Sequence, residues 1–98
     1  MSFQCISVDE AKKIIDENNL TIIDIRDYNS FSQGHIDNAI HVENLDIDSF
    51  INKKDKSEAI LIYCYHGNSS KSAANFFTQH GFEKVLSMDE GYSGWIKD

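Results

Sequence analysis

The chain has 98 residues, of which 41% are hydrophobic, and a formal net charge of −7. These values predict one compact domain with a modest core. The acidic balance, without a cluster of Lys and Arg, argues against a nucleic-acid partner and against binding to a membrane surface. The N-terminal residues resemble neither a signal peptide nor a membrane span, so we expect a cytoplasmic protein whose two cysteines, Cys5 and Cys64, stay as free thiols.

The first predicted helix begins at a capping box, in which the hydroxyl of Ser7 and the carboxylate of Glu10 can each accept a hydrogen bond from the other residue's backbone. The helix is expected to end at Asn18 and Asn19. Its apolar residues recur at helical spacing and predict one buried stripe made of Val8, Ala11, Ile14 and Ile15.

Strands and helices alternate after this point. Asp27 is expected to cap a short helix that Gly34 ends in a left-handed conformation, and Gly81 is expected to end the longest helix in the same way. This alternation predicts an α/β fold with a mostly parallel central sheet and helices on both faces. The predicted strands are Leu20–Ile25, Ala39–Val42, Ala59–Tyr63 and Val85–Ser87, and the predicted helices are Tyr28–Gln33, Ile47–Asn52, Ser69–His80 and a last helix after Gly91 that bears Trp95.

The stretch from Ile60 to Ser72, ILIYCYHGNSSKS, places a cysteine where an apolar strand passes into a polar turn. Ligands of parallel sheets bind beyond the carboxyl ends of the strands, where Cys64 is expected to lie. The helix that begins near Ser69 points unpaired N–H groups at this turn, and Gly67 allows the backbone to curl around an anion. A thiol in this setting should have a lowered pKa and react as the thiolate.

The two cysteines lead to different expectations. A free cysteine is more often buried and inert than reactive. The seven consecutive small or polar residues from His66 to Ser72 have no packing explanation, however, so we favour a reactive thiol at Cys64. Cys5 lies beside Ile6 near the start of the chain, and we expect it to be a small core residue.

Three motifs carry a family resemblance that covers nearly the whole chain. The stretch CYHGNSS, from Cys64 to Ser70, resembles the active-site loop of rhodanese-like domains, in particular the short single-domain thiosulfate sulfurtransferases of bacteria. DIRD followed by FSQGHIDNAIHV, and EGYSGW near the end of the chain, resemble two further family motifs. The sequence departs from the family pattern at Glu90, where a second glycine is more common, and at Asp37, where a proline is common; both departures concern local turn geometry.

The resemblance implies a sulfur transfer without cofactor or metal. Cys64 would attack the outer sulfur of thiosulfate, release sulfite and become a persulfide, and cyanide or a cellular thiol or dithiol, with a thioredoxin-like protein as one candidate, would then take that sulfur. The substrate-binding residues implied are Tyr65, His66, Gly67, Asn68, Ser69, Ser70 and Lys71, whose backbone N–H groups up to Ser70 would hold the charge of the terminal sulfur. Lys71 and His66 would add local positive charge, although His66 is as readily a solvated loop residue.

Two other functions remain open from the residues themselves. Cysteine phosphatases also carry a thiolate in a strand-to-helix loop, but their loop has an arginine six residues after the cysteine, where this chain has Ser70; the missing guanidinium argues strongly against phosphoryl transfer. A persulfide carrier loaded by a partner protein would use the same thiolate. Turnover with thiosulfate and cyanide separates the enzyme from the carrier.

Other polar and aromatic residues receive structural interpretations. The histidines at positions 35, 41 and 80 lack the spacing of a zinc site, and His35 is expected to fix a loop. Arg26 and Asp24 are expected to form an ion pair, a more frequent role than substrate contact for an arginine among acids. Aromatic residues expected to serve in packing are Phe76, Phe77, Phe82 and Trp95.

Overall fold

The computed structural model describes residues 3–17 and 20–96. Its strands form one five-stranded sheet in the order β1-β5-β4-β2-β3, and every pair of neighbouring strands is parallel. The predicted α/β fold with a parallel sheet is confirmed. The elements are β1 (Gln4–Ile6), α1 (Val8–Glu17), β2 (Thr21–Asp24), α2 (Tyr28–Gln33), β3 (Ile40–His41), a 3-10 turn (Val42–Asn44), α3 (Ile47–Lys53), β4 (Ile60–Tyr63), α4 (Ser69–Gln79), β5 (Val85–Met88) and α5 (Gly91–Trp95).

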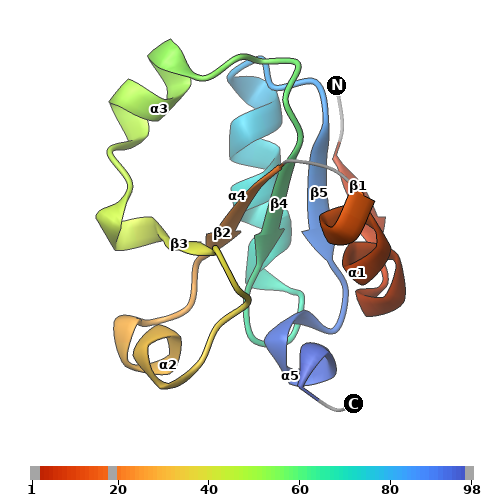
Figure 1. The fold of residues 1–98 in the computed structure, drawn as a ribbon. Helices are drawn as coiled ribbons and strands as arrows, with labels where there is room; N and C mark the ends of the chain where they lie inside the picture. The colour runs from red at the N-terminus through yellow and green to blue at the C-terminus, as the bar shows by residue number, and fades with distance from the viewer. Residues whose placement is uncertain (1–2, 18–19, 97–98) are drawn as a thin grey trace.

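Helices cover both faces of the sheet, and each face has its own apolar cluster (Figure 1). Alternate residues of the central strand β4 point to opposite faces: Leu61 and Tyr63 join the cluster that includes α1 and α5, whereas Ile60 and Ile62 join the cluster that includes α3 and α4. All four side chains of β4 are buried, as expected for a strand covered on both sides. The strand that leads to Cys64 is therefore the most enclosed part of the sheet.

The capping box predicted for the first helix is present. The backbone N–H of Glu10 donates to the Ser7 hydroxyl at 3.1 Å, and the backbone N–H of Ser7 donates to the Glu10 carboxylate at 3.2 Å. The expected end of this helix, at Asn18 and Asn19, lies outside the described residues. Asp27 caps α2 as predicted by accepting a hydrogen bond from the backbone N–H of Ser30 at 3.1 Å.

The prediction of a left-handed ending at Gly34 was wrong. Its φ of 168° is extended backbone, which any residue can adopt, so α2 ends there without a left-handed turn. Gly81 does have a positive φ, 95°, and ends α4 as expected. The difference is that the backbone after α2 continues into an extended segment, whereas the chain after α4 turns back sharply to enter β5.

Strand β1 was not predicted, and Cys5 was assigned wrongly to the core. Gln4 and Cys5 are exposed and only Ile6 is buried, because β1 is an edge strand that pairs with β5 alone. A three-residue edge strand with one buried side chain leaves no alternating apolar pattern to read. In the described part of the chain no helix is long and apolar enough to cross a membrane.

Candidate active site

The loop that carries Cys64 lies where the chain changes direction across the sheet. From β2 the chain crosses through α2 to the edge strand β3, and from β4 it crosses through α4 to β5 on the other side. The two strands are neighbours, with Asp24 paired in register with Tyr63. The loops that follow them, together with α2 and α5, occupy the carboxyl end of the sheet (Figure 1). This position is the usual binding site of open parallel sheets.

The sulfur of Cys64 accepts hydrogen bonds from the loop that surrounds it. The backbone N–H of Gly67 donates to Sγ at 3.1 Å, and the backbone N–H of Ser70 donates to it at 3.3 Å. Gly67 reaches this position with a φ of 94°, a conformation that side chains disfavour. Cys64 as a residue is only 6% exposed, so the sulfur lies at the floor of the loop.

The first turn of helix α4 lies beside the Cys64 sulfur. Asn68 precedes the helix, but it makes no side-chain capping bond to the described residues. An N-terminal turn leaves its first N–H groups without partners inside the helix. Here the Cys64 sulfur takes one of those donors, the N–H of Ser70, and so fills the place of a capping oxygen. A negative charge on the sulfur is then favoured by the positive end of the helix dipole.

The environment lowers the pKa of the Cys64 thiol, which is the net result of two opposing effects. Burial raises the pKa, because it penalises the charged thiolate. Hydrogen bonds to the sulfur lower it, led by the Ser70 hydroxyl and followed by the backbone N–H groups of Ser70, Gly67 and His66. The hydrogen bonds outweigh the burial, which agrees with the lowered pKa expected from the sequence.

Helix α5 donates hydrogen bonds to two carbonyl groups of the Cys64 loop. The backbone N–H of Tyr92 donates to the Cys64 carbonyl at 2.8 Å, and the N–H of Ser93 donates to the Tyr65 carbonyl at 3.0 Å. Gly91, expected just before this helix, is its first residue and is buried. A methyl group on Gly91 would lie 2.6 Å from the Tyr65 carbonyl oxygen, so only glycine lets the helix approach this closely.

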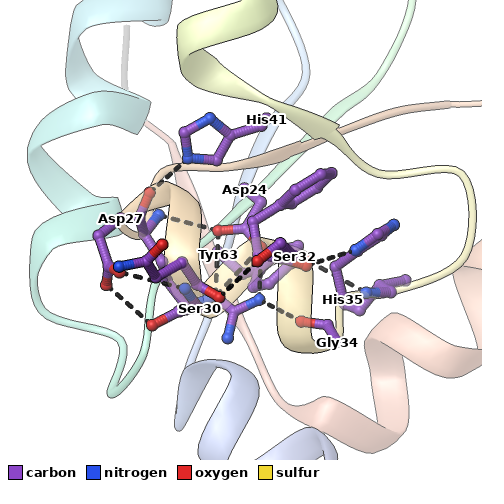
Figure 2. Close-up of polar contacts among 12 residues, drawn as sticks. Asp24, Asp27, Ser30, Ser32, Gly34, His35, His41 and Tyr63 are labelled. Atoms are coloured by element: carbon purple, nitrogen blue, oxygen red, sulfur yellow. Dashed lines mark hydrogen bonds and ion pairs between the residues drawn. The ribbon is translucent and has the colours of Figure 1, made fainter.

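A buried ion pair lies beside the loop. Arg26 Nη2 is 2.7 Å from Asp24 Oδ2 and also donates to the Gly34 carbonyl at 2.7 Å, which confirms the predicted pair (Figure 2). The Arg26 guanidinium carbon is 4.1 Å from the centre of the Tyr92 ring. Through Tyr92, whose N–H holds Cys64, the ion pair supports the position of the loop.

The remaining residues assigned to the site divide by exposure. Gly67 and Ser70 are buried with the sulfur, whereas the side chains exposed around the rim belong to Tyr65, His66, Asn68, Ser69 and Lys71. The backbone donors to the sulfur, Gly67 and Ser70, are two of the predicted loop positions. His66 Nδ1 lies 3.4 Å from the Ser93 hydroxyl, so this ring is placed by α5 at the rim.

The histidines outside the loop have structural partners. His35 Nδ1 lies 2.7 Å from the Phe31 carbonyl oxygen and its ring stacks on Phe31, in agreement with the predicted loop-fixing role. His41 Nε2 lies 2.6 Å from the Arg26 carbonyl oxygen. Within residues 3–17 and 20–96, no group of three or more histidine, cysteine or acidic side chains could hold a metal ion.

Sequence reasoning missed three residues that support the site: Tyr92, Gly91 in its contact with the loop, and Ser87. Tyr92 and Gly91 act through backbone contacts between segments distant in sequence, for which no local signal exists. Ser87 did leave a signal, because it is the one hydroxyl in the otherwise apolar strand VLSM and is fully buried. A buried hydroxyl requires a partner, and its partner is the Ser70 hydroxyl at 2.7 Å.

Comparison with known proteins agrees with this architecture. The family model of the rhodanese-like domain matches residues 7–98. The thiosulfate sulfurtransferase GlpE of Shewanella oneidensis is 39% identical over 94 residues, which cover 96% of this chain and 93% of that protein.

Solved structures show the same fold. A rhodanese-like domain from Anabaena sp. superposes with a TM-score of 0.79 at 28% identity, over 97% of this chain and 74% of that one. A rhodanese-like domain protein from Staphylococcus aureus superposes with the same TM-score of 0.79 at 24% identity, over 95% of this chain and 91% of that one. On the family match and the GlpE identity together, the chain belongs to the rhodanese-like domain family.

Proposed function

We propose that the protein is a thiosulfate sulfurtransferase in which Cys64 is the nucleophile. The observation that carries the proposal is the Cys64 sulfur, held by the N–H groups of Gly67 and Ser70 with its pKa lowered. A lowered pKa increases the share of the thiol that is present as the reactive thiolate at a given pH. The identity to a curated thiosulfate sulfurtransferase supports the same activity.

The proposed reaction has two displacement steps. The Cys64 thiolate attacks the outer sulfur of thiosulfate, a new S–S bond forms, and the original S–S bond breaks with its electron pair leaving on sulfite. Cys64 is then a persulfide. An acceptor nucleophile next attacks the outer sulfur of the persulfide, and the Cys64 thiolate leaves in its original form. With cyanide as acceptor the product is thiocyanate, and no external oxidant or reductant is needed.

The geometry suits a small sulfur donor. The outer sulfur of thiosulfate is a terminal atom, so it can reach a sulfur at the floor of the loop while the three oxygens stay at the rim. Sulfite is a stable anion, so its departure needs no strong proton donor. The loop N–H groups would stabilise the charge on the outer sulfur of the persulfide, as an oxyanion hole stabilises a developing negative charge.

The rim residues would bind the anionic donor. The loop from Tyr65 to Ser70 supplies two backbone donors to the sulfur, those of Gly67 and Ser70. The exposed Lys71 on the first turn of α4 would supply positive charge on an otherwise acidic protein. We assign Lys71 and His66 to donor binding and not to proton transfer, because neither displacement step requires a proton to move to the leaving group.

The acceptor in the cell is proposed to be a thiol or dithiol, with a thioredoxin-like protein as a candidate, whereas cyanide serves as the assay acceptor. A free-thiol mechanism suits the reducing cytoplasm, where we place the protein. The alternative of a persulfide carrier rests on the same sulfur geometry and differs in the donor: a carrier would accept sulfur from a protein and not from thiosulfate.

Intact-mass spectrometry after incubation with thiosulfate tests the proposal. We expect the wild type and Cys5→Ser to gain one sulfur atom and to release sulfite, and Cys64→Ser to gain none. Adding cyanide should remove the sulfur and give thiocyanate. Sulfur gain in Cys64→Ser would refute the assignment of the nucleophile, and no gain in the wild type with thiosulfate would refute thiosulfate as the donor and favour the carrier.

A further inference from the structure

Two fully buried hydroxyls lie beneath the loop of Cys64. Ser70 belongs to the first turn of α4 and Ser87 to β5, each is 0% exposed, and their oxygens are 2.7 Å apart. Ser87 is the only polar residue of its strand. Burying a hydroxyl costs free energy that a hydrogen bond must offset, and an alanine would fit a strand interior without that cost. Packing alone therefore does not explain a serine at position 87.

Ser70 connects this pair to the sulfur. Its backbone N–H donates to Cys64 Sγ at 3.3 Å, so the residue lies in direct contact with the reactive atom. Its hydroxyl makes the largest of the contributions that lower the pKa of Cys64. The chain of contacts runs from Ser87 through Ser70 to Cys64.

The number of available protons determines the direction of the hydrogen bonds between Ser87, Ser70 and Cys64. Each serine hydroxyl carries one proton, and a thiolate can only accept hydrogen bonds. If the Ser70 proton points at the sulfur, the proton between the two serine oxygens has to come from Ser87. A neutral thiol permits the opposite order, in which Ser70 donates to Ser87. The direction of the Ser87–Ser70 bond is thus linked to the charge on the sulfur.

We propose that Ser87 is a positioning residue: its hydroxyl donates to Ser70 Oγ and so keeps the Ser70 hydroxyl aimed at the Cys64 sulfur when that sulfur is ionised. Ser87 does not touch the reacting atoms. It acts by removing the competing acceptor for the Ser70 proton and by polarising the Ser70 hydroxyl, which strengthens the bond to the charged sulfur. The inference deepens the proposed sulfur transfer, but it concerns the ionisation of Cys64 and can be tested without any sulfur donor.

The test is the pH profile of Cys64 alkylation by iodoacetamide in a Cys5→Ser background, followed by intact mass. Ser87→Ala should move the midpoint of the profile upward by roughly half to one pH unit, because the charged sulfur loses part of one hydrogen bond. The rate near neutral pH should fall about three- to tenfold, whereas the rate at alkaline pH, where every thiol is ionised, should stay the same. A changed alkaline rate with an unchanged midpoint would mean altered access and would overturn the proposal.

A matched control removes a different buried hydroxyl of the same helix. Thr78 is 4% exposed and donates to the Asn75 carbonyl at 2.8 Å, near the far end of α4. Thr78→Val should lower the melting temperature and leave the alkylation midpoint in place. If Thr78→Val shifts the midpoint as much as Ser87→Ala does, general loosening of the fold explains both, and the proposal is wrong.

A double-mutant cycle tests the route through Ser70. Ser70→Ala should raise the midpoint at least as much as Ser87→Ala, and the double variant should resemble Ser70→Ala alone. Additive shifts would overturn the proposed route. Lys71, His66 and Arg26 with Asp24, and the acidic pair Asp89 and Glu90 after β5, are unchanged in all these variants, so their charges cannot cause the differences. Because alkylation needs no thiosulfate, failure of sulfur transfer and failure of this inference are separate outcomes.

Discussion

The two cysteines of this chain occupy opposite kinds of site in one sheet. Cys5 is exposed on β1, an edge strand, whereas Cys64 is nearly buried at the end of β4, the central strand. Exposure alone would favour Cys5 as the reactive thiol. The hydrogen bonds favour Cys64, because Gly67 and Ser70 donate to its sulfur and stabilise the thiolate. In this fold the donors around the Cys64 sulfur, and not its contact with solvent, lower the pKa of this thiol.

Strand β1, which carries Cys5, and the Cys64 loop also differ in the contacts that hold them in place. Strand β1 contributes one buried side chain, Ile6, and has a sheet neighbour on one side only. The Cys64 loop is held by the first turn of α4, by the N–H groups of α5 and, through Tyr92, by the Arg26 ion pair. A substitution in the loop support should therefore affect stability and reactivity together, whereas one at the exposed Gln4 or Cys5 of β1 should affect neither strongly.

The largest effect is expected from Gly91→Ala. The new methyl group would overlap the carbonyls of Cys64 and Tyr65, and the φ of 57° is unfavourable for alanine. Overpacking costs about 1–3 kcal/mol and a left-handed non-glycine residue about 1–2 kcal/mol, so we expect a loss of about 2–5 kcal/mol in the free energy of unfolding. Chemical denaturation measures it, and the sulfur gain from thiosulfate should fall in parallel. Wild-type stability in this variant would show that the helix can move away from the loop at no cost.

The next largest expected effect is a pH-dependent contribution of Cys64 to the free energy of unfolding. Its pKa is lower in the folded protein than in the unfolded chain, where a thiol titrates at about 8.5. The thiolate therefore stabilises the fold fully above the unfolded pKa, and this contribution is lost as the pH falls through the lower folded pKa. The difference in unfolding free energy between the wild type and Cys64→Ser should grow from acidic to alkaline pH. A difference that is constant or that shrinks with pH would contradict the lowered pKa.

A smaller effect, an increase in the free energy of unfolding, is expected from Glu90→Gly. This residue has a φ of 68°, in the left-handed region, at the position where the family more often has glycine. Glu90→Gly removes the left-handed penalty of about 1–2 kcal/mol and adds flexibility to the unfolded chain that costs about 0.5–1 kcal/mol. We expect a net gain of roughly 0.5–1 kcal/mol in thermal or chemical unfolding. Glu90→Ala, which keeps a side chain at the same φ, is the matched control and should show no such gain.

The smallest effect is expected at the exposed cysteine. Cys5→Ser changes one solvent-facing atom on an edge strand, so the free energy of unfolding should stay within about 0.5 kcal/mol of the wild type. Thermal unfolding measures the stability of this variant, and the rate of sulfur gain from thiosulfate measures its reactivity. A loss larger than 1–2 kcal/mol, on the scale of a buried substitution, would mean that β1 matters more to the fold than its contacts indicate.

Local signals predicted much of the fold. The capping box at Ser7, the cap at Asp27 and the helix from Ser69 depend on neighbours within one turn, and the structure has all three. The continuous apolar run that precedes Cys64 correctly identified a strand covered on both faces. Such features follow from short-range hydrogen bonding and side-chain periodicity, which a sequence displays directly.

Contacts between distant segments could not be read in this way. Strand β1 exists because β5 offers it a parallel neighbour, and Cys5 lies exposed on this edge strand. The placement of Tyr92 against the Cys64 carbonyl depends on how α5 docks on the loop. The position of Cys64 directly after the strand was predicted from its own segment, whereas the residues that contact its loop from α5 and β5 became evident only in the fold.

The docking of α5 has a consequence for how the site can be lost. This helix has only five residues and is the last element of the described chain, yet it holds two carbonyls of the Cys64 loop. Short elements with few buried side chains open more often than central strands, at a fraction of the free energy of global unfolding. On warming, sulfur gain from thiosulfate should decline before the sheet melts, and early deuterium uptake at the Tyr92 and Ser93 amides would mark the release of the Cys64 loop.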